Sequence, residues 1–286
     1  MAPNGERIGV IAGSGAFPIH FARAARSAGH HVTALAIQGF ASPDLAKHVD
    51  EIHWLGVGQL DTLIGLCHQN RISQLTLAGK IEHISLFNLG QVEARVVRLL
   101  SRLSDRRAGS LTRALIEELE NENIRVLDSS LFLKSLLPAE GLLTKKRPLS
   151  PREQRGIDFA WPLVRDIARL DIGQSIVVKD GVVVAVEGAE GTDETIRRGG
   201  QLAGPGALVL KVSRPQQDFR FDLPVVGLGT IRTLVEVKAA ALAISAGETI
   251  FLDQEESIAL AEQSNIGIVA RSDRPAHPDP TGGKPS

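Results

Sequence analysis

The sequence predicts an α/β protein of two domains, with a Rossmann-like parallel sheet domain followed by a mixed α/β domain. From residue 7 to residue 128, short β-rich runs alternate with amphipathic segments, as parallel strands joined by crossover helices require. Between two later β-branched runs, Asp180 and Gly181 form a pair that is typical of an antiparallel hairpin. The chain has 286 residues, which is too long for one small core and suits two.

In the first half, the β-rich runs are separated by segments whose apolar residues recur every three or four positions. A helix that covers a sheet requires this spacing. The expected strands span residues 7–12, 31–37, 51–55, 74–78 and 125–127. The expected helices span residues 17–28, 59–70, 91–103 and 110–123.

The second half is expected to mix helices with antiparallel strands. Ser150 can cap a helix over residues 151–169, because Pro151 suits the first turn and Glu153 stands three residues after the serine. Further strands are expected at residues 175–179, 182–187, 208–212, 249–252 and 267–270. Further helices are expected at residues 230–245 and 254–264.

Pro, Gly and basic residues concentrate between the two halves, in a stretch that fits no helix or strand period. We therefore expect an N-terminal domain at residues 1–137, a linker at 138–150 and a C-terminal domain at 151–271 that carries the main catalytic motif. Residues 272–286 contain repeated prolines and no large apolar residue, so this tail is expected to be disordered.

Composition excludes several classes of function. Lys and Arg number 32 and Asp and Glu number 33, so no overall positive field exists to gather nucleic acid. The single cysteine, Cys67, cannot form an internal disulfide, and the histidines show no metal-ligand spacing. No basic segment leads into an apolar run at the N-terminus, and no apolar run is long enough to span a bilayer. We expect a cytoplasmic protein.

Two candidate ligand-binding loops follow expected parallel strands. Gly13, Ser14 and Gly15 end the first strand, and glycines there let the backbone approach a phosphate at the start of the next helix. Lys80 ends the fourth strand, where open α/β sheets hold ligands. A plain tight turn and a solvated loop lysine are the alternatives. Pro18 replaces the third glycine of the dinucleotide fingerprint, which disfavours NAD.

Several acids lie close together between residues 187 and 194, directly after an expected strand. Mg²⁺ prefers oxygen ligands, and a helix start offers free N–H groups to a phosphate. Asp193 and Glu194 are therefore candidate metal ligands, and Thr192 is a candidate substrate contact. In the alternative interpretation, Thr192 caps the helix and the acids stabilise its first turn.

The strongest candidate motif lies in the second half. Asp218, Arg220 and Asp222 alternate, so in an extended backbone they project to one face while Phe219 and Phe221 anchor the other. Two carboxylates beside a guanidinium can position a cation and hold a phosphate oxygen, as hydrolysis of a phosphoanhydride requires. An ordinary ion pair on an edge strand has the same pattern.

Three segments, residues 11–18, 190–194 and 213–227, together resemble the LpxI family in content, order and separation. The resemblance spans residues 7–271. It implies Mg²⁺-dependent hydrolysis of the pyrophosphate bond of UDP-2,3-diacylglucosamine to UMP and 2,3-diacylglucosamine 1-phosphate (lipid X), a step of lipid A biosynthesis. It also implies that the substrate is held between the two domains.

The resemblance further implies roles for individual residues. The family's essential aspartate falls on Asp222, which either binds Mg²⁺ or orients the attacking water. Asp218, Asp193 and Glu194 are the supporting candidates for metal ligands. The candidates for substrate binding are Gly13, Ser14, Gly15, Lys80, Thr192, Lys211, Arg214, Gln217 and Arg220.

Expected partners follow from the same features. The family pattern and the apolar helix expected at residues 230–245 favour a homodimer. Lys145, Lys146 and Arg147 are candidates for peripheral contact with inner-membrane head groups, with a solvated linker as the alternative. Two rival functions are an NAD-dependent oxidoreductase built on the Rossmann-like half, and a carrier that binds lipid X or a sugar nucleotide without cleaving it.

Overall fold

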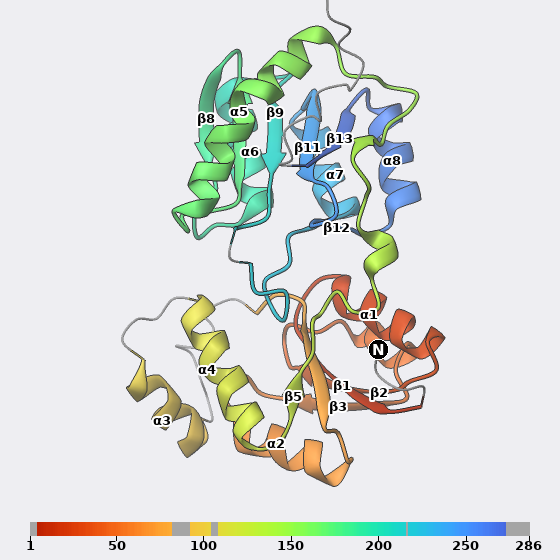
Figure 1. The fold of residues 1–286 in the computed structure, drawn as a ribbon, viewed down its shortest axis with the longest axis vertical. Coiled ribbons are helices and arrows are strands. Elements are labelled where there is room, and N and C mark those ends of the chain that lie inside the picture. Colours follow the sequence, from red (N-terminus) through yellow and green to blue (C-terminus); the bar gives the residue numbers. More distant parts are fainter. Residues whose placement is uncertain (1–4, 82–91, 104–107, 216, 273–286) are drawn as a thin grey trace, which may run out of the picture. The chain divides into compact units, whose positions relative to one another are not determined.

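The computed structural model describes residues 5–81, 92–103, 108–215 and 217–272. The chain divides into two compact units, drawn in Figure 1. Unit 1 comprises Met1–Leu136 and Gln216–Leu223, and unit 2 comprises Leu137–Pro215 and Pro224–Ser286. The tail expected to be disordered lies outside the described residues from residue 273 onward.

Unit 1 contains the Rossmann-like parallel sheet that the sequence predicts. Its strand order is β3-β2-β1-β4-β5, and each neighbouring pair is parallel. In β1, every residue after the first is buried, because helices cover both faces of such a sheet. The strands are β1 (Arg7–Ala12), β2 (His31–Ile37), β3 (Glu51–Leu55), β4 (Gln74–Ala78) and β5 (Arg125–Val126).

The helices of unit 1 start and end within a few residues of their predicted positions. They are α1 (Phe17–Ser27), α2 (Leu60–Gln69), α3 (Ala94–Arg102) and α4 (Ala108–Asn121), with short 3₁₀ turns η1 (Pro43–Lys47) and η3 (Lys134–Leu136). One apolar cluster joins α2, α3 and α4 to the sheet through Ile64, Leu99, Ile116 and Leu75. Burial of apolar area in this cluster is the main stabilising term for the unit.

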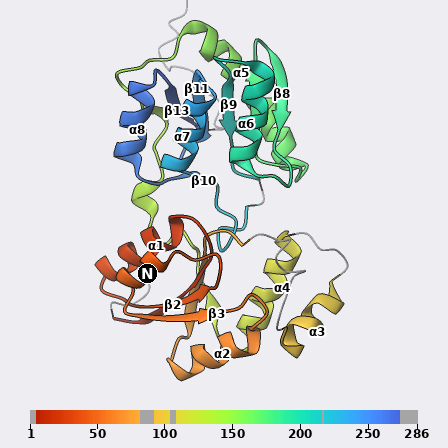
Figure 2. The same cartoon turned by 180° about the vertical axis from the view of Figure 1, so that it is seen from behind.

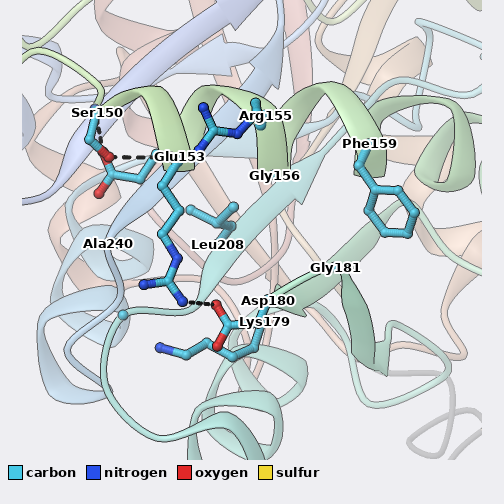
Figure 3. A pocket seen from close by; sticks show the side chains of 12 residues that line it. Ser150, Glu153, Arg155, Gly156, Phe159, Lys179, Asp180, Gly181, Leu208 and Ala240 are labelled. Carbon is cyan, nitrogen blue, oxygen red and sulfur yellow. Dashed lines mark hydrogen bonds and ion pairs between the residues drawn. The ribbon is translucent and has the colours of Figure 1, made fainter.

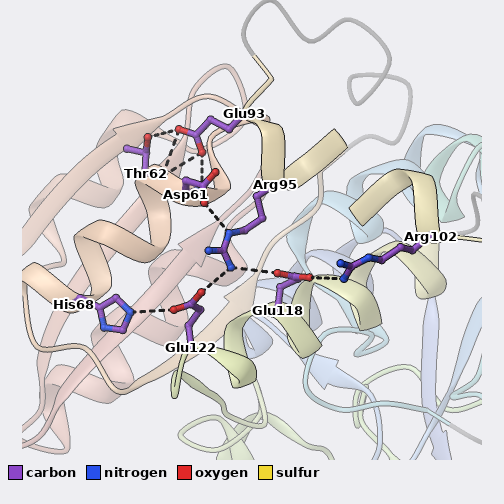
Figure 4. A network of polar contacts seen from close by, with 8 residues as sticks. All are labelled: Asp61, Thr62, His68, Glu93, Arg95, Arg102, Glu118 and Glu122. Carbon is purple, nitrogen blue, oxygen red and sulfur yellow. Dashed lines mark hydrogen bonds and ion pairs between the residues drawn. The ribbon is translucent and has the colours of Figure 1, made fainter. Parts of the chain in front are cut away.

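Helix α3 is held to its neighbours by a polar network that Figure 4 shows. The Arg95 guanidinium contacts Asp61 of α2 at 2.7 Å, Glu118 of α4 at 3.2 Å and Glu122 at 2.7 Å. The hydrogen bonds that Arg95 donates to Asp61 and Glu122 raise the pKa of Arg95, so the guanidinium stays charged. Because Leu99 is the buried residue of this short helix, we infer that Arg95 contributes much of its attachment.

Unit 2 contains a mixed sheet, again as the sequence predicts. Its strand order is β6-β13-β11-β9-β7-β8, in which β13, β11 and β9 are parallel and the others join antiparallel. Asp180 and Gly181 both have positive φ, as the predicted hairpin between β7 and β8 requires. The strands are β6 (Gly141–Leu142), β7 (Ser175–Lys179), β8 (Val182–Val186), β9 (Leu208–Lys211), β11 (Ala241–Ser245) and β13 (Gly267–Arg271), with a separate parallel pair β10 (Val225–Val226) and β12 (Ile250–Phe251).

Helices cover both faces of the sheet in unit 2. Ile176 and Val178 of β7 face α5, whereas Val177 between them faces the cluster that includes α6 and α7 residues. Figure 2 shows α6, α7 and α8 in front of the sheet. Ser150 and Glu153 form the predicted capping box at the start of α5. The helices are α5 (Pro151–Arg169), α6 (Thr192–Ala203), α7 (Leu228–Glu236) and α8 (Gln254–Gln263).

The helix predicted at residues 230–245 is wrong in its second half. Helix α7 ends at Glu236, Lys238 adopts a positive φ of 52°, and Ala241–Ser245 forms the fully buried strand β11. Alanines favour a helix intrinsically, but pairing with β9 and β13 on both sides overrides this weak preference. The helix from which a homodimer was expected is thus shortened to α7, and the homodimer stays a prediction.

The stretch predicted to be an irregular linker at residues 138–150 is part of unit 2. Strand β6 pairs with β13, and the Thr144 hydroxyl accepts a hydrogen bond of 2.9 Å from the N–H of Ile268. The Arg147 guanidinium forms a two-point ion pair with Glu153, at 2.6 Å for each contact, and its side chain is only 13% exposed. Arg147 is therefore a structural residue, whereas Lys145 and Lys146 remain exposed.

Among the residues that the structure describes, no helix combines the length and the apolar character needed to cross a membrane. The longest helix, α5, carries charged residues along its length and has a Pro at position 162. This agrees with the absence of long apolar runs in the sequence.

Candidate active site

The segment Gln217–Leu223 packs with unit 1, although it lies in the second half of the sequence. The carbonyl of Phe219 accepts hydrogen bonds from the N–H and the hydroxyl of Ser129, at 3.0 and 2.8 Å. Ser129 is 1% exposed, and Phe221 packs against the apolar cluster of unit 1. The motif thus lies within the sequence of the second half, but its contacts are with unit 1, because the chain leaves the sheet of unit 2 before the motif begins.

The motif itself is a turn, so the extended backbone that the alternation predicts is also wrong. The carbonyl of Asp218 accepts the N–H groups of Phe221 and Asp222 at 3.1 and 2.9 Å. The Asp218 carboxylate accepts the N–H of Arg220 at 3.1 Å, which is the local turn that Asp side chains favour. Phe219, expected to be an anchor, is 38% exposed.

Asp218 and Arg220 form a two-point ion pair within this turn. The guanidinium Nε lies 3.0 Å from Oδ1 and Nη2 lies 2.8 Å from Oδ2. The hydrogen bond from Arg220 holds the pKa of Asp218 below its ordinary value, and the pKa of Arg220 is raised in return. Arg220 also contacts Glu120 of α4 at 3.3 Å. Both carboxylate oxygens of Asp218 are thus engaged by the guanidinium.

The backbone of Asp222 is fixed on both sides. Its N–H donates to the carbonyl of Asp218 at 2.9 Å, and its carbonyl accepts a hydrogen bond from the Gln217 side-chain amide. The Asp222 side chain is half-buried. Gln217, expected to bind substrate, therefore has a role in holding the catalytic candidate in place.

The two candidate loops of the first half lie side by side, as their positions in the sheet predict. The Ser14 N–H and hydroxyl each donate to the Lys80 carbonyl at 2.8 Å, and the Lys80 N–H donates to the Ser14 carbonyl at 3.1 Å. The Gly13 N–H donates to Ala78 at 2.8 Å. A Cβ on Gly13 would lie 2.6 Å from the Lys80 carbonyl oxygen, so this loop contact requires glycine.

These contacts change the interpretation of the glycine-rich loop. The backbone N–H groups of Gly13 and Ser14 bind the neighbouring loop, so they do not form the predicted phosphate cradle. Gly15, with a φ of 93°, and the Lys80 side chain are exposed at the carboxyl end of the sheet. They are the parts of these loops that a ligand can reach.

In unit 2, Thr192 and Lys211 are in direct contact. The Lys211 ammonium donates to the Thr192 hydroxyl at 3.0 Å and to the carbonyl of Val225 at 2.8 Å. The Thr192 hydroxyl donates to Glu187 at 3.0 Å. Gly191, with a φ of 83°, is the N-cap of α6, so the interpretation of Thr192 as the cap was wrong. Glu187 was not among the predicted site residues. Its position directly after an apolar strand was the one signal in the sequence that could have pointed to it.

The acids in the first turn of α6 fit the helix interpretation better than the metal interpretation. Asp193 is exposed, and Glu194 pairs with Arg197 one turn later at 2.5 Å. Arg214, a candidate for phosphate contact, lies 3.2 Å from Asp171. Within the described parts of the chain, no three His, Cys, Asp or Glu side chains are grouped to hold a metal ion.

The expected metal ligands divide between the two units. Asp218 and Asp222 belong to unit 1, and Asp193 and Glu194 belong to unit 2. With both oxygens of Asp218 engaged by Arg220, neither unit by itself presents the predicted set of four carboxylates.

Figure 3 shows an open groove of about 550 Å³ in unit 2, beside the start of α5. Arg152 and Asp180 form an ion pair of 2.6 Å in it, with Phe159 and Lys179 nearby. The residues that line this groove include none of the candidate site residues. We therefore assign it no part in the active site.

Comparison with known proteins complements this geometry. The LpxI N-terminal domain model matches residues 7–136, and the LpxI C-terminal domain model matches residues 139–269. The chain belongs to the LpxI family. A protein of Caulobacter vibrioides named UDP-2,3-diacylglucosamine pyrophosphatase LpxI is 29% identical over 277 residues, which cover 92% of this LpxI-family chain and 97% of that protein.

Solved structures add little to the assignment to LpxI. Glycinamide-RNase-transformylase T from Mycobacterium tuberculosis is 14% identical over 63% of this chain and 44% of its own, with a TM-score of 0.23. Phosphoribosylglycinamide synthetase from Anaerococcus prevotii is 13% identical over 64% of this chain and 38% of its own, also with a TM-score of 0.23. This chain spans less than half the length of either, and TM-scores this low carry no argument.

Proposed function

We propose that this LpxI-family chain hydrolyses the pyrophosphate bond of UDP-2,3-diacylglucosamine to UMP and lipid X, in lipid A biosynthesis. The observation that carries the proposal is the match over both domains, together with a relative of that name aligned over 97% of its length. One P–O bond of the diphosphate breaks, and water supplies the oxygen of the new phosphate.

We assign the central role to Asp222. Hydrolysis of a phosphoanhydride depends mainly on positioning the attacking water and neutralising charge. A carboxylate can orient a water molecule or accept its proton. The hydrogen bonds to both sides of the Asp222 backbone support this assignment, because they restrict where the carboxylate points.

Arg220 is proposed to bind a phosphate oxygen. Of the five N–H groups of its guanidinium, Asp218 takes those on Nε and Nη2, and Glu120 takes one on Nη1, so at most two remain for a ligand. The ion pair pre-orients the guanidinium, so less side-chain freedom is lost when a phosphate binds. In this account Asp218 is a positioning residue and does not bind metal.

Mg²⁺ dependence is a separate part of the proposal. Mg²⁺ is commonly bound through one or two carboxylates together with the phosphates of the substrate. We do not carry Asp218 forward as a ligand, because both of its carboxylate oxygens are engaged by Arg220. Asp222 is the carboxylate that we propose as the Mg²⁺ ligand, and when bound, Mg²⁺ would neutralise charge on the diphosphate.

Substrate binding by residues of both units completes the proposal. The candidates in unit 1 are Gly15, Lys80 and Arg220, and those in unit 2 are Lys211 and Arg214. Lys80 and Arg214 are substituted in separate variants. A loss of substrate affinity in both supports binding by residues of both units. Unchanged KM in one of the two variants removes that unit from the proposal.

The rival functions make different predictions for the purified protein. We expect turnover of UDP-2,3-diacylglucosamine that chelation of Mg²⁺ abolishes, and no heat of binding for NAD in calorimetry. Binding of the lipid without turnover in the presence of Mg²⁺ supports the carrier instead. NAD binding without hydrolysis supports the oxidoreductase.

A further inference from the structure

Three polar side chains in unit 2 form a chain of hydrogen bonds outside the Asp222 turn. Lys211 ends β9, Thr192 begins α6, and Glu187 directly follows β8. The Lys211 ammonium donates to the Thr192 hydroxyl at 3.0 Å, and this hydroxyl donates to Glu187 Oε1 at 3.0 Å. Lys211 is 6% exposed and Glu187 is 7% exposed. We name this chain the Glu187 relay.

The direction of every bond in the relay follows from the chemistry of the groups. An ammonium only donates, so the Thr192 oxygen accepts from Lys211. Its single proton goes to Glu187 at 3.0 Å, with the Ser175 hydroxyl farther away at 3.4 Å. Burial of a charge is costly unless an opposite charge or hydrogen bonds compensate it. The relay supplies both, because it links a buried cation to a buried anion through one hydroxyl.

Glu187 is itself held firmly at the other end. Its Oε2 accepts the N–H of Gln174 at 3.3 Å, and its own N–H donates to the carbonyl of Ser175 at 2.9 Å. Gly173 lies so close that a Cβ there would be 2.0 Å from the Glu187 carbonyl oxygen. The backbone of unit 2 thus fixes the position of Glu187. Through Thr192, Glu187 in turn restricts the position of the Lys211 ammonium.

The second bond of Lys211 reaches the chain just after the segment that carries Asp222. Its ammonium donates to the carbonyl of Val225 at 2.8 Å. Val225 stands three residues after Asp222, where the chain has just returned to unit 2. The N–H groups of Ile250 and Leu252 donate to the carbonyls of Pro224 and Val226, both at 2.9 Å. These bonds hold the backbone on either side of Val225 against β12.

We propose that Glu187, acting through Thr192, is a positioning residue that fixes the Lys211 ammonium. Lys211 in turn anchors the chain at Val225, three residues after Asp222. Thr192 and Val225 take two of the three ammonium N–H groups. At most one donor therefore remains for a phosphate oxygen, and the first role of Lys211 is positional. The inference rests on the proposed function, because the segment matters to a diphosphate substrate only if Asp222 does.

Conservative variants separate positioning from simple support of the fold. Glu187→Gln keeps the size of the side chain and removes its charge. Thr192→Val removes the linking hydroxyl, whereas Thr192→Ser keeps it. A misplacement of about 1 Å can cost a catalytic step on the order of 10²-fold. We expect kcat to fall by at least about tenfold in Glu187→Gln and Thr192→Val, with KM within about threefold, and Thr192→Ser to retain most of kcat.

Glu190→Gln is the matched control. Glu190 lies in the same connection between β8 and α6 but pairs with Arg198, away from Lys211. We expect its kcat to equal that of the wild type. Wild-type kinetics in Glu187→Gln, or an equal loss of kcat in Glu190→Gln, would overturn the proposal.

A second measurement does not depend on activity. Denaturant unfolding of Glu187→Gln, Lys211→Met and the double variant tests whether the two charges are coupled, as buried partners in one network are. We expect the double variant to be less destabilised than the sum of the single variants, and additive losses would contradict the relay. If the wild type fails to hydrolyse the sugar nucleotide, the proposed function is wrong. The unfolding measurements on the single and double variants still show whether Glu187 and Lys211 are coupled.

Discussion

Asp218 and Arg220, two residues apart, form a two-point ion pair in which the guanidinium lies 3.0 Å from one carboxylate oxygen and 2.8 Å from the other. This pair orders a turn that would otherwise be an irregular connection. It also separates the roles of the two aspartates, because Asp218 is engaged by the guanidinium and Asp222 is held through its backbone.

The ion pair should make stability depend on pH in a defined direction. Arg220 lowers the pKa of Asp218 in the folded chain. The resulting stabilisation is present above the unfolded pKa, which is about 3.9 for aspartate, and is lost as the pH falls through the lower folded pKa. We expect the difference in melting temperature between the wild type and Asp218→Asn to be largest near neutral pH and to shrink in acid. A difference that grows as the pH falls contradicts the assignment.

Arg95 should control the attachment of α3. Arg95→Ala removes contacts with Asp61, Glu118 and Glu122, and leaves those carboxylates close together. We expect hydrogen exchange of the α3 amides to accelerate by about tenfold or more, since a network of this kind contributes on the order of 1–2 kcal/mol. Arg98→Ala, on the exposed side of the same helix, is the control. Equal acceleration in both variants means that the network does not hold the helix.

The contact between the Gly13 and Lys80 loops should tolerate no side chain at Gly13. A Cβ there meets backbone at 2.6 Å, so we expect Gly13→Ala to destabilise unit 1 by about 1–3 kcal/mol and to lower activity. Gly65→Ala is the matched control. It lies within α2 with no atom near the added Cβ, so it should be neutral or stabilise by about 0.5–1 kcal/mol. Chemical denaturation measures both, and equal stability of the two variants contradicts the loop contact.

Peripheral membrane contact is testable through Lys145 and Lys146. Both are exposed, whereas the neighbouring Arg147 is paired with Glu153. If these lysines bind anionic head groups, each contributes about 1 kcal/mol near the surface. We expect the double Ser variant to float less with anionic liposomes than the wild type. The control replaces the exposed Arg152 and Arg169, and unchanged flotation of the lysine variant excludes the contact.

Much of the fold could be predicted because its signals are local. Strands β1 and β2 are buried on both faces and therefore appear as continuous apolar runs. The start of α5 is encoded within four residues by Ser150 and Glu153. By contrast, β11 consists of residues that also suit a helix, and only its neighbours in the sheet decide the outcome.

The candidate site was less predictable, because long-range contacts build it. The turn at Asp218 depends on the contact between Phe219 and Ser129, which are 90 residues apart in the sequence. The Glu187 relay needs three separate elements to meet at one point. No local pattern reports such convergence, whereas family resemblance selected Asp222 as the candidate without any geometry.

The most direct measurement compares the wild type with Asp222→Asn on UDP-2,3-diacylglucosamine, with products identified by ³¹P NMR. Asparagine keeps the shape of the side chain and removes its negative charge. We expect the wild type to form UMP and lipid X, and the variant to lose about 10²- to 10⁴-fold in kcat with binding largely retained. Full activity of Asp222→Asn, together with an inactive Asp218→Asn, would contradict the central assignment.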